Sequence, residues 1–503
     1  MGEVAGDAGA TGVRPLDGHV HPTRDDAVAR ALSEGLGGPV GEHAGRHRWW
    51  TPVRVLLALT AVCFALGMVQ KSGCFERTWQ DNQAGYAQMC YSDLPYLYTG
   101  RGLVERAWPY SDDPAVRERF PEVMEYPVGI SYLAYGTSLL TQAVVGWPDL
   151  APRQALATDQ LFVDPEVSQE IRWFMVVSAL VFAALALLTT WFVAGTHRRR
   201  PWDAAMLAAS PTLLLTGLIN WDLLAVALTA GAVWAWSRDR PVLTGVMVGL
   251  GTAAKLYPLF LLGGVLVVCL RQRRYRDLGV TIAVAVAAWL VANLPALLTG
   301  PEQWRVFWSF NSERGPDLGS LWLVARDALD TDITAHTVNV GSWLFFGAWC
   351  LGVLVLGLRA PQTPRLAQLG FLVVVGFLLV NKVYSPQYVL WLLPLAVLAR
   401  PRWRDQVVWQ GAEILYFASV WWYLGGYLAP GGGGDAGFYW VAIVVRVAGE
   451  LYLTALVVRD VLRPERDPVR AAPDLGRGSA APGLPPGGGA GQATTTRSND
   501  VVV

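Results

Sequence analysis

Lysine is nearly absent from this sequence of 503 residues. Only Lys71, Lys255 and Lys382 occur among forty cationic residues, and the remaining cations are arginines. Charge of either sign is also scarce, because 16% of the residues are charged where a soluble domain carries about 25%. Forty acidic residues balance the forty cations, so the net charge is zero. This balance argues against a nucleic-acid-binding surface and against an acidic, solvating chain.

Long apolar blocks dominate what the sequence does contain, since 53% of its residues are hydrophobic. A membrane-spanning helix needs roughly 20 mostly apolar residues. The clearest candidate spans are 53–69, 171–195, 277–298, 340–358, 366–381, 385–399, 407–425 and 436–458. Two further blocks, 202–237 and 241–270, are each long enough for a helical hairpin. We therefore predict an all-α polytopic membrane protein with a bundle of about 12 transmembrane helices.

Arginine-rich breaks between the blocks indicate the orientation of the chain. Examples are 197–200, 271–276 and 400–404, and the positive-inside rule places such breaks in the cytoplasm. Basic residues also precede the first block, so we expect both termini to be cytoplasmic. The first span then leads outside, and the span 171–195 must lead back inside to the basic break at 197–200. A single crossing at 128–147 would reverse the direction of that later span, so this apolar stretch cannot cross the membrane once. We predict a re-entrant or interfacial segment there.

The predicted membrane domain spans residues 49–462. Two large extracytoplasmic loops belong to it, a first loop at 70–127 and a second loop at 300–339. The tails 1–48 and 463–503 are rich in glycine, alanine, proline and aspartate. Such a composition cannot bury a core, so we predict that both tails are disordered and cytoplasmic.

Cysteine is also scarce, with five residues in the chain. Cys63, Cys269 and Cys350 lie in predicted spans or at their ends, whereas Cys74 and Cys90 lie in the first extracytoplasmic loop. Thiols on the oxidising side of a membrane can pair. We predict a Cys74–Cys90 disulfide, and the alternative is two free thiols.

All three lysines fall on the predicted outer side, against the positive-inside bias. Lys255 and Lys382 each stand at the end of a span, close to a tyrosine and a proline. Cations at that position favour an anionic ligand such as a lipid phosphate. Lysine attracts a phosphate as a point charge, and arginine can bind it through two parallel hydrogen bonds. We predict that Lys255, Lys382 and Arg305 bind this phosphate. The alternative is that the lysines snorkel and anchor helix ends.

Several outer-side motifs carry a resemblance to a known family. The first loop contains Asp93-Leu94-Pro95-Tyr96-Leu97-Tyr98, Gly100-Arg101-Gly102-Leu103, Pro109-Tyr110 and Glu125-Tyr126-Pro127. Later motifs are Asn220-Trp221-Asp222, Lys255-Leu256-Tyr257-Pro258 and Ser385-Pro386-Gln387-Tyr388. In this order, over roughly residues 50–460, they resemble glycosyltransferase family 87. Its members are polytopic enzymes of the GT-C class.

The resemblance implies a function at the outer face. An enzyme of this family moves a sugar, most often mannose or arabinose, from a polyprenyl-phosphate donor to a cell-envelope glycolipid or polysaccharide. Transfer needs a carboxylate to deprotonate the acceptor hydroxyl and cations to stabilise the leaving phosphate. Asp93 matches the family's general base by position, and Asp81 is the second choice. No cofactor, metal site or nucleic-acid partner is expected.

The same motifs imply a set of substrate-binding residues. The predicted residues are Tyr96, Tyr98, Arg101, Tyr126, Asp222, Tyr257, Asn311 and Gln387. The tyrosines, with Trp221 and Trp304, can stack on a sugar or face the lipid. The alternative for any aromatic residue here is the interfacial belt that polytopic proteins share.

Two alternatives accompany this interpretation. A non-catalytic polyprenyl-phosphate flippase or transporter is the second function class, and it would show polar residues along a path and related halves. Within the spans, Arg446 and Glu450 stand four residues apart on one helix face. Charges at membrane depth are costly and usually paired, so we predict a structural ion pair there.

Overall fold

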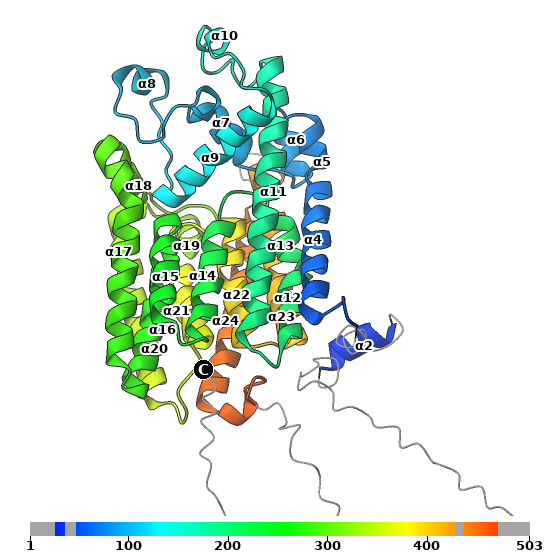
Figure 1. Cartoon of the computed structure of the whole chain (residues 1–503), viewed down its shortest axis with the longest axis vertical. Helices are drawn as coiled ribbons and strands as arrows, with labels where there is room; N and C mark the ends of the chain where they lie inside the picture. The colour runs from blue at the N-terminus through cyan, green and yellow to red at the C-terminus, as the bar shows by residue number, and fades with distance from the viewer. Residues whose placement is uncertain (1–25, 36–46, 429–435, 471–503) are drawn as a thin grey trace, which may run out of the picture.

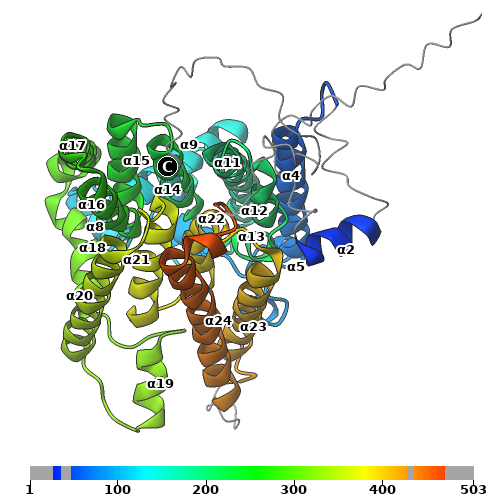
Figure 2. The same cartoon turned by 90° about the horizontal axis from the view of Figure 1, so that it is seen from below.

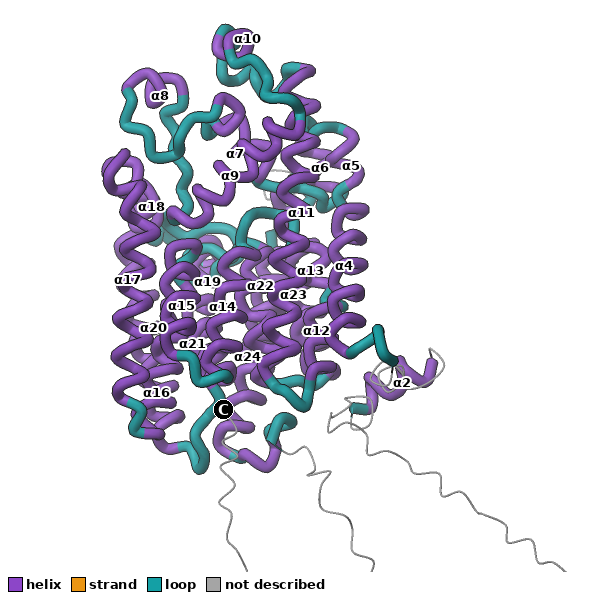
Figure 3. Tube along the Cα trace, in the orientation of Figure 1, coloured by secondary structure: helices purple, strands orange, loops and turns teal. Residues whose placement is uncertain are grey.

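The computed structural model describes residues 26–35, 47–428 and 436–470. Within these ranges all regular structure is helical, and the tube in Figure 3 shows helices and loops without a strand. The helices form one bundle (Figure 1). This confirms the prediction of an all-α membrane protein.

Five described helices are long and apolar enough to cross a membrane. They are α4 (Pro52–Gln70), α11 (Pro165–Thr196), α17 (Tyr275–Thr299), α20 (Ala335–Arg359) and α24 (Gly437–Leu462). Shorter apolar helices are α14 (Leu223–Trp236), α15 (Pro241–Ala254), η3 with α16 (Tyr257–Phe260 and Leu261–Gln272), α21 (Leu366–Val380) and η4 with α22 (Pro386–Tyr388 and Val389–Ala399). α23 (Trp403–Leu424) packs beside α24. The total of about twelve crossings stays a prediction.

The sequence marks the starts of the long helices. Thr51 caps α4 by accepting a hydrogen bond from the Arg54 amide, and Pro52 occupies the first turn. Asp164 caps α11 in the same way, with Pro165 following it. A short polar side chain followed by proline satisfies the free amides and fixes the backbone angle at a helix start. These caps end the loops and begin the apolar segments.

Two glycines bring α15 and α17 into close contact. A Cβ atom on Gly245 would lie 2.6 Å from the Thr281 carbonyl oxygen, and one on Gly249 would lie 2.3 Å from the Ala285 carbonyl oxygen. No side chain fits at either position. Glycines four residues apart are typical of helices that pack closely inside a membrane.

The bundle has two unlike ends. One end, called here the cavity end, carries the short helices between α4 and α11 together with α18 (Pro301–Glu313) (Figure 1). Those short helices are α5 (Ser72–Glu76), α6 (Asn82–Ala87), α7 (Leu94–Gly100), η1 (Leu103–Glu105), α8 (Pro114–Arg119), α9 (Val128–Val144) and α10 (Ala151–Gln154). The opposite end, called the tail end, carries α2 (Ala27–Gly35) and the last described residues. Seen from the tail end, α2 and α4 lie on one flank, and α17 and α20 lie on the other (Figure 2).

The predicted re-entrant or interfacial segment 128–147 corresponds to α9. This helix has 17 residues and is not among the described helices that are long and apolar enough to cross a membrane. Figure 1 shows α9 lying obliquely at the cavity end, near α7 and α18. It packs on α11, α15 and α17. This placement fits a segment that does not cross the bundle.

A buried ion pair organises the region between α4 and α11. Arg153 on α10 meets Glu170 on α11 at 2.5 Å, and both side chains are almost fully buried. The Tyr98 hydroxyl donates to the same Glu170 carboxylate, while the Gln142 amide donates to the Tyr98 oxygen. Tyr98 is therefore part of a structural core and does not face a cavity.

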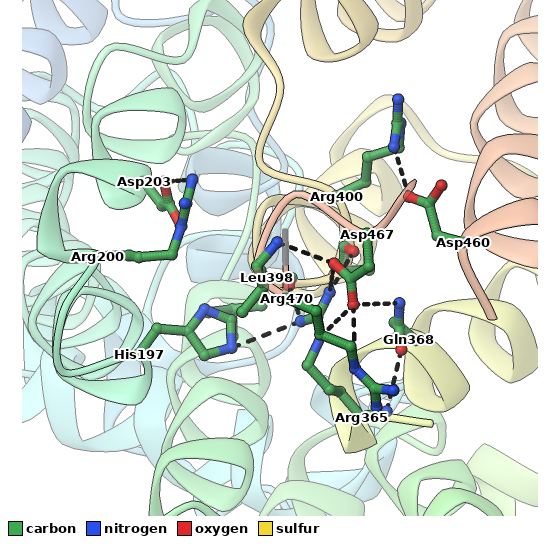
Figure 4. A network of polar contacts seen from close by, with 12 residues as sticks. His197, Arg200, Asp203, Arg365, Gln368, Leu398, Arg400, Asp460, Asp467 and Arg470 are labelled. Carbon is green, nitrogen blue, oxygen red and sulfur yellow. Dashed lines mark hydrogen bonds and ion pairs between the residues drawn. The ribbon is translucent and has the colours of Figure 1, made fainter. Parts of the chain in front are cut away.

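A second polar network closes the tail end (Figure 4). Arg365, before α21, bonds both carboxylate oxygens of Asp467 at 2.9 and 3.0 Å, and Gln368 adds a bond at 3.3 Å. Arg365 also donates to the carbonyls of Leu398 and Ala399 at the end of α22. A single guanidinium thus joins the residues after α24 to the ends of two other helices.

Other ion pairs extend the tail-end network in Figure 4. Arg400 contacts Asp405 at 2.6 Å and also pairs with Asp460 on α24. On the other side of Arg365 and Asp467 in Figure 4, Arg200 meets Asp203 at 2.7 Å. The basic breaks between spans therefore do more than set orientation, because they also tie helix ends together.

Parts of both predicted tails lie within the described residues. Residues 463–470, placed by composition in the disordered C-terminal tail, contain η6 (Pro464–Arg466) and the buried Asp467. At the other terminus, α2 lies within the predicted tail 1–48, and the Trp403 amide donates to Asp26 at 3.0 Å. A hydrogen bond holds the first segment to the bundle, and ion pairs with hydrogen bonds hold the second; composition averages do not register such contacts.

The predicted intramembrane pair forms within the bundle. Arg446 contacts Glu450 at 3.0 Å on one face of α24, and both side chains are buried. Arg446 also donates to the Gly319 carbonyl at 3.0 Å and lies over the Tyr384 ring. The pair therefore fixes the loop before α19 (Leu321–Ala328) against the segment before η4.

Candidate functional site

A cavity of about 630 Å³ lies at the cavity end, where the first loop meets the rest of the bundle. Its walls come from the segments 91–101 and 125–127, from Asn220, from the turn 255–257, from the stretch 307–314 on and after α18, from residues 339–346 on α20, and from residues 377–391 between the end of α21 and α22. Most of the predicted site residues reach it. The lining members of that set are Asp93, Tyr96, Arg101, Tyr126, Lys255, Tyr257, Asn311, Lys382 and Gln387.

Asp93 is held at the start of α7. Its amide donates to the Ile219 carbonyl at 2.9 Å, and the preceding Ser92 hydroxyl donates to the Leu218 carbonyl, also at 2.9 Å. The Asp93 carboxylate accepts a hydrogen bond from the Tyr126 hydroxyl at 3.3 Å. Two backbone segments far apart in the sequence therefore fix the position of this carboxylate.

Burial raises the pKa of Asp93 to about 6. The Tyr126 hydrogen bond opposes this shift, the negative charge of Asp222 adds to it, and the positive charge of Lys255 opposes it. A carboxyl group with this pKa is ionised at neutral pH and is still a stronger base than an exposed aspartate.

Lys255 is tied to Asp222. Its ammonium lies 2.9 Å from the Asp222 carboxylate, and the rings of Tyr126, Tyr388 and Trp391 surround it at 4.6 to 5.9 Å. Burial alone would lower the pKa of Lys255, but the charge of Asp222 outweighs this effect and raises it. Lys255 is therefore charged, and Asp222 neutralises it within the site.

Lys382 has different partners. Its ammonium donates to the Asn311 carbonyl at 2.6 Å and to the Asn339 side-chain oxygen. No carboxylate lies within ion-pair distance of it among the described residues. Burial and the charge of the nearby Arg314 lower the pKa of Lys382. A further acceptor that carries negative charge would stabilise this cation.

Arg101 lies at another part of the lining, with its charge already satisfied. It contacts Glu125 at 2.5 Å and also pairs with Glu122. Arg314 is likewise paired, with Asp317 at 2.5 Å. These two arginines can orient ligands through hydrogen bonds, but their net charge is compensated.

Some predicted residues lie outside the cavity lining. Arg305 on α18 is exposed and pairs with Glu302 at 2.9 Å, so the structure does not bring it to the other cations. Asp81, the second choice of base, caps α6 by accepting from the Ala84 amide. Tyr98 is buried as described, and Trp304 lines a separate small cavity beside α9.

Sequence reasoning missed two residues at this site. Lys71, directly after α4, is fully buried, and its ammonium donates to the Tyr91 carbonyl at 2.8 Å. Burial lowers the pKa of Lys71 to about 7, while the charge of Asp93 opposes the shift. Asn220 also lines the cavity. The rarity of lysine was a usable signal for the first, and the Asn220-Trp221-Asp222 motif was one for the second.

The disulfide lies close to Lys71. Cys74 on α5 is bonded to Cys90, with Cα atoms 5.7 Å apart. The disulfide closes a loop that ends just before Asp93. Gln70 adds a hydrogen bond to the Met89 carbonyl at 2.7 Å. The end of α4 and the following α5 therefore hold Met89, Cys90 and Tyr91, just ahead of Asp93.

Within the described ranges, no group of three or more histidine, cysteine, aspartate or glutamate side chains is arranged to hold a metal ion.

Comparison with known proteins gives one family match. The model of glycosyltransferase family 87 matches residues 164–381, from the start of α11 to the end of α21. The matched region contains Asp222 and Lys255, whereas the first loop with Asp93 lies outside it. No curated protein matches the chain.

Proposed function

The chain belongs to glycosyltransferase family 87 and is a membrane glycosyltransferase; we propose that its sugar donor is a polyprenyl-phosphate sugar and its acceptor a cell-envelope glycolipid or polysaccharide. Mannose and arabinose are the proposed sugars. The cavity end faces the outside of the cell in this proposal, because the arginine-rich breaks gather at the tail end.

One observation carries the proposal: the cavity holds one unpaired carboxylate and one unpaired cation. Among the charged lining residues that the structure describes, Arg101, Lys255 and Arg314 are all in ion pairs. Asp93 and Lys382 are not. Glycosyl transfer from a phosphate needs a base at the acceptor and a cation at the leaving group, and these two residues supply one of each.

The proposed reaction uses both groups directly. Asp93 takes the proton from an acceptor hydroxyl as the oxygen attacks the anomeric carbon of the donor sugar. The bond between that carbon and the phosphate oxygen breaks, and the phosphate leaves with the bonding electrons. Lys382 offsets the negative charge that develops on it, and the Tyr126 hydroxyl stabilises the ionised form of Asp93.

The rest of the lining suits a lipid-linked donor. Phe307 and Phe310 on α18, and Trp343 and Phe346 on α20, give the cavity an apolar wall beside Lys382. Trp343 and Phe310 are also exposed on the bundle surface, where an isoprenoid chain would lie in a membrane. A phosphate at Lys382 would thus sit at the border between the polar and apolar parts.

Reconstitution of the purified protein tests the proposal. Vesicles would contain a polyprenyl-phosphate mannose or arabinose, together with glycolipids extracted from a strain that lacks the protein. We expect one lipid donor to support transfer, and Lys382→Met to lower its rate strongly. Arg305→Ala, which removes an exposed cation outside the cavity, is the matched control and should leave the rate unchanged.

Two results would oppose the proposal. Transfer from a nucleotide sugar without any lipid donor would exclude the donor class. Movement of the lipid across the vesicle membrane without formation of product would indicate the flippase alternative instead.

A further inference from the structure

Two buried amide side chains in the cavity wall each have one polar atom without a hydrogen-bond partner among the described residues. Asn220 is 2% exposed and Gln387 is 4% exposed, and both line the cavity. The Asn220 Nδ2 atom and the Gln387 Oε1 atom have no partner among the described residues. Buried polar atoms are nearly always paired, so each unpaired atom calls for an explanation such as a ligand.

The hydrogen bonds around Asn220 fix the direction of its amide. Its Oδ1 atom accepts from the Asp222 backbone amide at 3.0 Å. The Nδ2 group is therefore the free donor of this side chain. Gln387, from η4, offers the opposite function through its free Oε1 atom, which is an acceptor.

Lys255 belongs to the same part of the wall, and its partner Asp222 lies behind it, outside the lining. Asp222 is 1% exposed, and its second oxygen accepts from the Trp391 indole at 2.9 Å. The aromatic surround of Lys255 continues through Tyr257, whose ring stacks on Trp391 at 4.6 Å. The wall therefore presents aromatic faces and one ammonium, and the buried Asp222 carboxylate offsets the charge of that ammonium from behind.

Resting on the proposed function, we propose that Asn220, Gln387 and Lys255 bind the ring of the donor sugar, and that this subsite, in which Asp222 offsets the charge of Lys255, accepts an uncharged sugar. A hydroxyl group both donates and accepts hydrogen bonds, so it satisfies an amide donor and an amide acceptor together. Lys255 then contacts sugar hydroxyls, and Lys382 alone binds the phosphate.

The same groups discriminate against charged sugars. A sugar carboxylate would face the unpartnered Gln387 oxygen, which repels an anion, and the Lys255 charge that could attract it is already offset by Asp222. A sugar ammonium would face Lys255 in the same way. Leaving a buried polar group unpaired typically lowers affinity by about 10- to 100-fold. The subsite therefore selects a neutral hexose or pentose over a uronic acid or an amino sugar.

Binding to two lipids separates sugar recognition from phosphate recognition. The full-length protein in nanodiscs would be titrated with polyprenyl phosphate, which has no sugar, and with the mannosyl or arabinosyl form. We expect Asn220→Ala and Gln387→Ala each to weaken the sugar-bearing lipid about tenfold or more and to leave the sugar-free lipid unchanged. Lys382→Met should weaken both lipids by the same factor. Gln169→Ala, an exposed amide on α11, is the matched control.

An equal effect of the amide variants on the two lipids would overturn the inference, as would no effect on either. Because the two amides are replaced separately, a folding defect in one variant leaves the other as a test.

A soluble probe keeps the inference independent of the lipid donor. If the wild type binds neither lipid, the proposed donor is wrong. Binding of methyl mannoside and methyl arabinoside then tests the sugar subsite by itself. A rise in unfolding temperature with either glycoside, lost in Gln387→Ala, supports the sugar subsite. The absence of any rise, or an equal rise with methyl glucuronide, contradicts it.

Discussion

Tyr126→Phe removes one hydroxyl from the cavity and keeps the aromatic ring beside Lys255. The lost hydroxyl donates to Asp93 at 3.3 Å and stabilises the charged form of that carboxyl group. A hydrogen bond to a charged group contributes about 1.5–3 kcal/mol. This bond is long, so we take the lower limit, which corresponds to about one pKa unit at 1.36 kcal/mol per unit. The pKa of Asp93 should rise from about 6 to roughly 7.

The change appears in the pH dependence of transfer. A base acts when it is deprotonated, so the rate rises as the pH increases through the pKa of Asp93. At pH 6 about half of the wild-type carboxyls are ionised, against about one in eleven in the variant, so the rate should fall about fivefold. At pH 8 the two rates should be nearly equal. The assay is sugar transfer in vesicles across this pH range.

Tyr110→Phe is the matched control, because its hydroxyl bonds Ser131 at 3.1 Å and makes no contact with Asp93. It should leave the pH profile unchanged. The reasoning is refuted if Tyr126→Phe lowers the rate by one factor at every pH, or if its acidic limb coincides with that of the wild type.

Further predictions concern residues around the cavity and at the tail end. Lys71→Met removes a hydrogen bond and a charge next to the base. The acidic limb of the variant's pH–rate profile should move to higher pH, and an unmoved limb would contradict an electrostatic role of Lys71. Replacing Cys74 and Cys90 with serine opens a link across 16 residues; it should cost about 3 kcal/mol of stability, and reductant should no longer lower the unfolding temperature measured in detergent. Asp467→Asn breaks a buried ion pair and should cost about 3–5 kcal/mol, whereas exposed Glu465→Gln should change the unfolding temperature little.

The sequence predicted the helical membrane architecture because long apolar runs have few alternative structures. It also brought Asp93, Lys255 and Lys382 to one end of the bundle, since motifs at span ends must lie on the same side if the parity of the spans is right. The placement of α9 followed from the same parity. These inferences depend on periodicity and charge sign, which local sequence carries.

Contacts between distant segments were beyond the sequence. Nothing local to Lys255 indicates that Asp222 neutralises it, and nothing local to Arg305 indicates that its helix turns it away from the cavity. The burial of Asp467 against Arg365 likewise depends on contacts between residues 102 positions apart. The packing of the bundle decides which charges pair. Residue type alone therefore assigned too many cations to the donor phosphate.

The side chain of Asp93 carries the central claim, and its replacement by asparagine tests it most directly. Asp93→Asn keeps the shape of the side chain and the hydrogen-bonding distance to Tyr126 but removes the base. We predict that transfer from the lipid donor falls by about 10²- to 10⁴-fold, while binding of the donor persists. Asp81→Asn, in which asparagine still caps α6, should transfer at the wild-type rate. Transfer by Asp93→Asn at the wild-type rate would contradict the assignment of the base and with it the account of the cavity.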